Sequence, residues 1–180
     1  MKTGLSVHAG AAMVLSGVCL VLALGTFLPG TWLPRHSSLV LGVVCAALFP
    51  LFAGAVVRAI ALATHGVRVQ GNPMLLWLAL RSLPTAVGAV LAGFSVLGVA
   101  LLASTATGHD SRQAGKAVKG HYYASQEDGP RHEQVPVSRT EYDGLLAHDL
   151  RSMLALVGLM ADLAAVSTLV SGQLHPLTRP

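Results

Sequence analysis

The chain has 180 residues, of which 53% are hydrophobic and only 11% are charged. An ordinary soluble domain carries about 25% charged residues, so this composition excludes that class and predicts that lipid surrounds most of the chain. The net charge is +4, but the basic residues are scattered at the ends of apolar segments, which excludes a nucleic-acid-binding stripe.

Four apolar runs are long enough to cross a membrane. A spanning helix needs about 20 predominantly apolar residues, and the runs lie at about 9–28, 38–57, 85–104 and 153–171. The length of the chain fits one compact helical bundle. We therefore predict an all-α membrane protein with four transmembrane helices.

The segment between the second and third runs has its own helix signal. Asn72 is a good N-cap, and Pro73 suits the first helical position. We expect either an interfacial helix at about 73–83 that is kinked into the third span or one long bent helix. Pro84 follows it, and a proline that removes a backbone donor bends the chain at this point into the third span.

A polar module at 105–149 separates the third span from the fourth. It divides the chain into 1–104 with three spans, the module itself, and 150–180 with the fourth span and a short tail. Seven of the eight acidic residues of the chain lie in this module: Asp110, Glu127, Asp128, Glu133, Glu141, Asp143 and Asp149. This partition predicts that the module lies in water.

The order of residues inside the module predicts a small β-hairpin followed by a helix. A strand at 121–125 leads into a Glu-Asp-Gly-Pro turn, and 131–137 is the returning strand. Ser138 and Glu141 match the capping box that begins a helix. If it is unbroken, this helix runs from about residue 139 through the fourth span to about residue 171.

The distribution of positive charge favours cytoplasmic N- and C-termini. An even number of spans puts both termini on one side, and the short connections on that side carry Lys2, Arg58, Arg68 and Arg81 against Arg35 on the other. The abundance of Leu, Ala, Val and Gly suggests a high-GC bacterial genome. We therefore expect a multi-pass protein of a bacterial plasma membrane.

Asp162 is the one acidic residue inside an apolar run. An ionised carboxylate at the centre of a spanning helix costs about 2.5–3.5 kcal/mol, so it must be paired, protonated or in contact with water. The functional hypothesis is a proton or cation relay or a substrate contact. The structural alternative is a buried pair with Arg58, Arg81 or a Ser/Thr cluster; the arginines can also extend to lipid headgroups.

The sequence contains no motif that is typical of a metal site or of a catalytic centre. His109, His121, His132 and His148 follow one another at spacings of 12, 11 and 16, without the close pairs of a zinc site. No C-x-x-C, P-loop, H-E-x-x-H or nucleophile elbow occurs. We expect no metal, no cofactor and no enzymatic activity.

The module resembles part of a known group of proteins. Tyr122 and Tyr123 are followed by the sequence Val-Ser-x-x-Glu-Tyr at 137–142 and then by Arg151 before the last span. This order is similar to that in a group of small uncharacterised bacterial four-span membrane proteins. The resemblance covers about 30 residues and implies a folded module; it assigns no catalytic or binding residue.

Two functional hypotheses follow. The first is a non-catalytic accessory or interaction subunit that presents the 105–149 module to a protein partner or to a second copy of the chain. Its candidate interaction residues are Tyr122, Tyr123, Glu141 and Tyr142. The second is a small transporter or channel subunit that uses Asp162 inside the bundle.

Overall fold

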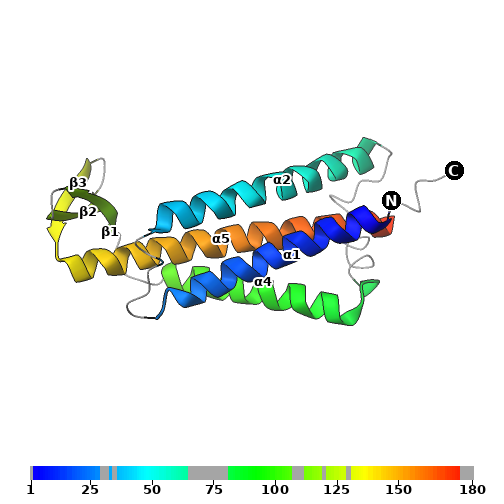
Figure 1. Ribbon diagram of the computed structural model, residues 1–180, viewed down its shortest axis with the longest axis horizontal. Coiled ribbons are helices and arrows are strands. Elements are labelled where there is room, and N and C mark those ends of the chain that lie inside the picture. Colours follow the sequence, from blue (N-terminus) through cyan, green and yellow to red (C-terminus); the bar gives the residue numbers. More distant parts are fainter. Residues whose placement is uncertain are drawn as a thin grey trace.

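The computed structural model describes residues 2–28, 33, 36–64, 81–106, 112–118, 121–128 and 131–174. Its helices are α1 (Lys2–Gly25), α2 (Ser37–Thr64), α4 (Thr85–Ala106) and α5 (Arg139–Leu174). Its strands are β1 (Arg112–Val118), β2 (His121–Asp128) and β3 (Arg131–Val137). The helices form an up-and-down bundle, and the strands form a small sheet at one end of it (Figure 1).

All four helices are long and apolar enough to cross a membrane, as the sequence predicts. The apolar stretches are Ser6–Gly25, Ser37–Ala61 and Thr85–Ala106, and the fourth lies within Arg139–Gln173. Pro50 lies inside α2, which continues past it. The predicted interfacial helix at 73–83 lies outside the described residues, apart from its last three positions.

Helix α5 is the centre of the bundle. It packs against α1, α2 and α4, whereas those three helices touch one another sparsely (Figure 1). Within the apolar stretch of α5, 56% of the residues are buried inside the protein, against 17% in α2 and in α4. The core therefore surrounds α5, and it includes Leu150 and Leu154 of α5 together with Cys19 and Leu20 of α1.

Glycines let α4 approach two neighbouring helices closely. A Cβ on Gly98 of α4 would lie 2.7 Å from Leu159 Cδ2 of α5, and a Cβ on Gly17 of α1 would lie 3.2 Å from Phe94 Cζ of α4. These contacts place α4 against both α5 and α1.

The sheet is a three-stranded antiparallel meander in the order β1-β2-β3. The predicted hairpin is present as β2 and β3, which pair from Tyr122↔Val137 to Asp128↔Arg131. The prediction of only two strands is wrong, because β1 adds a third strand against β2. The sequence of β1 is short and polar, with a glycine in its interior, and such residues have low strand propensity.

A β-bulge interrupts β1. Ala114 pairs with Ala124 and Ala117 with Tyr122, so β1 has one residue more than β2 between these two pairs. A Cβ on Gly115, inside the bulge, would lie 2.7 Å from the carbonyl oxygen of Tyr123. Only glycine fits this position without a backbone shift.

The Ser138 half of the predicted capping box is present at the start of α5, whereas the Glu141 carboxylate pairs with Arg112. The backbone N–H of Glu141 donates to Ser138 Oγ at 3.2 Å, and the N–H of Tyr142 donates to the Ser138 carbonyl at 2.9 Å. Helix α5 has 36 residues, or roughly 54 Å at 1.5 Å per residue. A bilayer core is about 30 Å thick, so α5 is long enough to extend several turns beyond it.

Candidate functional site

The sheet is held on the first turns of α5 by hydrogen bonds to the bulged strand. Tyr142 Oη donates to the carbonyl of Gly115 at 3.1 Å, and the N–H of Ala114 donates to Asp149 Oδ2 at 3.0 Å. Both contacts use backbone groups at the bulge. The extra residue of β1 therefore serves to direct the strand's backbone toward α5.

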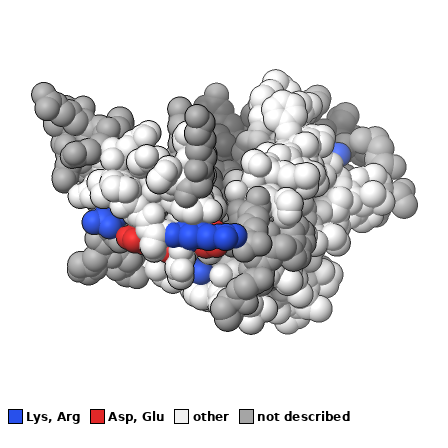
Figure 2. Space-filling view, turned by 60° about the vertical axis from the view of Figure 1, so that its left-hand side comes forward, with Lys and Arg blue, Asp and Glu red and all other residues white. Residues whose placement is uncertain are grey.

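Charged and aromatic side chains add to this contact. Arg112 Nη1 lies 3.2 Å from Glu141 Oε1, and Arg112 Nε donates to Gln126 Oε1 at 3.2 Å. The rings of Tyr122 and Tyr142 lie 5.1 Å apart at 42°. Figure 2 looks toward the end that carries the sheet, and the basic and acidic side chains visible there lie beside one another.

These contacts divide the four predicted interaction residues into two groups. Tyr122, Glu141 and Tyr142 lie in the contact between the sheet and α5. Tyr123 follows Tyr122 on the same strand and so points to the opposite face of the sheet, because successive strand side chains alternate. Of the four, Tyr123 is the residue on the face directed away from α5.

The two edges of the sheet differ. The outer edge of β1 is covered by α5 through Asp149, whereas the outer edge of β3 pairs with no other element in the described parts of the chain. Pro136 lies opposite Tyr123 and cannot donate to β2, so this pair is of the non-hydrogen-bonded kind. By alternation, the N–H and carbonyl of Gln134 also point outward.

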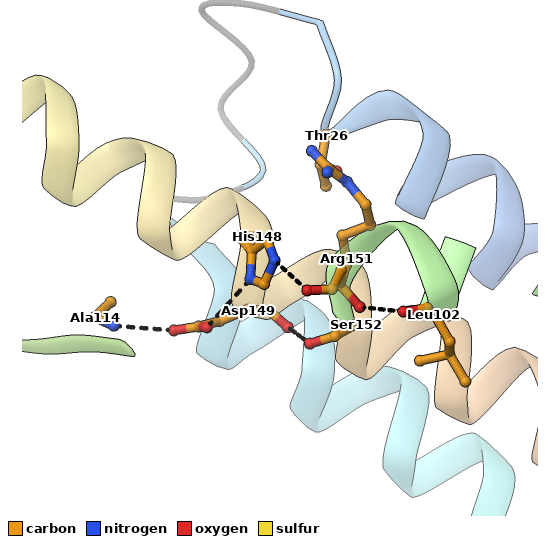
Figure 3. A network of polar contacts seen from close by, with 8 residues as sticks. Thr26, Leu102, Ala114, His148, Asp149, Arg151 and Ser152 are labelled. Carbon is orange, nitrogen blue, oxygen red and sulfur yellow. Dashed lines mark hydrogen bonds and ion pairs between the residues drawn. The ribbon is translucent and has the colours of Figure 1, made fainter. Parts of the chain in front are cut away.

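A polar network joins the sheet to the bundle (Figure 3). His148 Nε2 lies 3.1 Å from the carbonyl of Thr105 in α4 and donates to it, because a carbonyl only accepts. The neighbouring Asp149 accepts from β1. One turn of α5 therefore contacts α4 and the sheet together.

Arg151 extends this network to the end of α1. Its Nε donates to Thr26 Oγ1 at 3.0 Å, and its Cζ lies 3.5 Å from the centre of the Phe27 ring. Arg151 is half-buried, and its contacts are a hydrogen bond and a cation–π interaction. The sequence marks Arg151 only as the basic residue before the last span.

Asp162 is buried between helices, with 3% of its surface exposed. Ser95 Oγ of α4 donates to its Oδ2 at 2.5 Å. Its Oδ1 has no hydrogen-bond partner among the described residues. One oxygen of the carboxyl group therefore accepts a hydrogen bond from a serine, and the other accepts none from the described residues.

The two arginines of the predicted intramembrane site lie away from Asp162 along the helices. Arg81 is exposed and lies before the start of α4 at Thr85, and the rise of α4 from Thr85 to Ser95 is roughly 15 Å. Arg58 lies toward the end of α2, and its buried Nη1 has no hydrogen-bond partner in the described parts. The structure thus places both arginines near one end of the bundle and does not bring them to Asp162.

A second serine lies level with Asp162. Gly158 of α5 faces Cys19 and Leu20 of α1, and the two helices are antiparallel (Figure 1). One turn further along both helices brings Ser16 opposite Asp162. Ser16 is fully buried, and its Oγ also lacks a hydrogen-bond partner in the described structure.

Sequence reasoning finds Asp162 but not its serine neighbours. A carboxyl group in an apolar run is conspicuous, whereas a serine in a spanning helix is common and bonds to its own backbone. The described residues contain no group of three His, Cys, Asp or Glu side chains placed to hold a metal ion. No protein-family model matches the chain, and neither does any curated protein or solved structure.

Proposed function

We propose that this chain is a non-catalytic accessory subunit of a bacterial plasma membrane that presents its sheet to a protein partner. With cytoplasmic N- and C-termini, the sheet lies on the outer side. The partner binds along the outer edge of β3 and on the sheet face that carries Tyr123.

The observation that carries this proposal is how the sheet is mounted. An ion pair, a tyrosine pair and two bonds to the bulged strand fix β1 and β2 on α5. A segment that only connects two spans needs none of these contacts. These contacts use the outer edge of β1 and the sheet face toward α5. They leave the outer edge of β3 and the opposite face of the sheet available to a partner.

The exposed groups on β3 suit an extended peptide segment. An open strand edge offers alternating donors and acceptors, which a partner strand can satisfy by adding to the sheet. Pro136 removes one donor at the end next to α5. The partner strand therefore pairs best near Gln134, which is exposed.

Two substitutions at one position test this proposal. Gln134→Pro removes an outward N–H without removing a bond to β2, and Gln134→Ala keeps that N–H. After gentle solubilisation of native membranes, a stoichiometric partner is expected to co-purify with the Ala variant and to be lost with the Pro variant. Equal recovery with both would exclude the β3 edge, and recovery after replacement of the whole 121–137 hairpin would refute the accessory role.

Orientation is tested separately with a single cysteine. In a Cys45→Ser background, a cysteine introduced by Gly129→Cys is expected to react with a membrane-impermeant maleimide in intact cells. Labelling only after lysis would place the sheet in the cytoplasm and contradict the proposed topology.

A small transporter or channel subunit is the second candidate, and the unpartnered Oδ1 of Asp162 favours it. This role predicts that Asp162→Asn leaves the protein folded in the membrane but inactive. Loss of the folded protein from the membrane would instead identify a structural role for the hydrogen bond with Ser95.

A further inference from the structure

An ionised Asp162 would have no counter-charge among the described residues. The carboxyl group is 97% buried, and among these residues it bonds to Ser95 alone. Ser16, on the same level of α1, has a buried hydroxyl that also lacks a hydrogen-bond partner in the described structure. No salt bridge to Asp162 occurs among the described residues, although a buried charge is normally paired. Oxygen atoms of Ser16 on α1, Ser95 on α4 and Asp162 on α5 thus lie at about one level of the bundle, and a single positive charge would neutralise the carboxylate.

An apolar groove lies between α1 and α4 at the same level. Its volume is about 440 Å³, and its walls are entirely apolar; they include Val14, Gly17 and Val18 of α1 and Val90 and Phe94 of α4. Val14 is 68% exposed. The groove therefore opens on the outside of the bundle, where lipid would lie.

The wall between the groove and the carboxyl group is thin. Gly17 and Phe94 line the groove, and their chain neighbours Ser16 and Ser95 belong to the polar cluster. The ring of Phe94 lies over Gly17, where a Cβ would be 3.2 Å from Cζ. The ring fills the space that a side chain at Gly17 would occupy, so access from the groove to Asp162 requires Phe94 to move.

We infer that α1, α4 and α5 form a binding site for a lipid-soluble ammonium ion. Its apolar body lies in the groove, and its ammonium group is held by Asp162, Ser95 and Ser16. An anion would be repelled by the carboxylate. A divalent cation takes six or more oxygen ligands, commonly from several carboxylates, whereas an ammonium group needs only a few acceptors around one charge. This inference is independent of the sheet and its partner.

The test uses octylammonium, with octanol as a neutral molecule of the same apolar length. The full-length protein in lipid nanodiscs is treated with dicyclohexylcarbodiimide, an apolar reagent for buried carboxyl groups, and the adduct on Asp162 is quantified by peptide mass spectrometry. The reagent is expected to label Asp162 from the lipid side. Octylammonium is expected to slow this labelling at least tenfold, and octanol to leave it nearly unchanged.

Matched variants connect the protection to the groove. Val18→Trp fills the groove and is expected to abolish protection by octylammonium. Val43→Trp, on an exposed position of α2, is expected to preserve it. Asp162→Asn is expected to remove any rise in melting temperature that octylammonium produces in the unmodified protein.

Three results would overturn the inference: no labelling of Asp162 without ligand, equal protection by octylammonium and octanol, or undiminished protection in Val18→Trp. The labelling experiments do not use the Asn variant, so they remain decisive even if that variant fails to fold. None of the outcomes depends on a protein partner.

Discussion

Replacing Gly115 with alanine should loosen the sheet from α5. The new Cβ would lie 2.7 Å from the backbone oxygen of Tyr123, which cannot move without moving β2. Overpacking of this kind costs about 1–3 kcal/mol. The shift would also break the hydrogen bond from Tyr142 to the Gly115 carbonyl, which contributes about 0.5–1.5 kcal/mol. Together these losses are about 1.5–4.5 kcal/mol.

Amide hydrogen exchange of β1 and β2 in nanodiscs measures this loss. Since 1.4 kcal/mol corresponds to a factor of ten, protection of these strands should fall about 12- to 1,600-fold. The transmembrane part of α5 should keep its protection, because its core lies far from the bulge.

Gly144 provides the matched control. It is an exposed position of α5 where a Cβ would meet nothing within 4 Å, and alanine there should stabilise the helix by about 0.5–1 kcal/mol. Gly144→Ala should therefore raise protection slightly. Unchanged protection in Gly115→Ala, or an equal fall in both variants, would refute the steric reasoning.

Three further substitutions have defined outcomes. Tyr142→Phe keeps the ring contact but loses the bond to the bulge, so exchange of β1 should quicken about 2- to 13-fold, for a loss of 0.5–1.5 kcal/mol. Gly98→Val meets the side chain of the facing α5 residue at 2.7 Å and should lower the melting temperature in detergent, since overpacking costs about 1–3 kcal/mol. Gly88→Val, with open space around it, should not lower the melting temperature. Equal effects of the two substitutions on the melting temperature would contradict the packing of α4 against α5. Arg151→Gln loses the cation–π contact and the charged donor to α1, so the same melting assay should show a fall; no change would mean that this contact contributes nothing.

Local sequence signals predicted much of the fold. The spans are visible because length and hydropathy are properties of a single segment. The hairpin and the start of α5 are visible because turn residues and the box from Ser138 to Glu141 act within a few residues. Strand β1 has no such signal: it is fixed by Asp149, which lies 35 residues from Ala114 in the chain. Contacts of this range cannot be inferred from local propensity.

Only part of the candidate intramembrane site could be predicted from the sequence. Asp162 stands out because a lone acid in an apolar run is costly wherever it lies. Its partner depends on the register between α4 and α5, which is set where Gly98 meets Leu159. Charge alone suggested Arg58 or Arg81, but packing brings Ser95 instead.

The central place of α5 has a consequence for biosynthesis. A ribosome makes this helix last, after α1, α2 and α4 have already left the exit tunnel. Those three helices touch one another sparsely, so until α5 is made they lack most of the contacts that hold the bundle together. Synthesis interrupted before residue 139 would leave α1, α2 and α4 without their common neighbour, and therefore without most of the core.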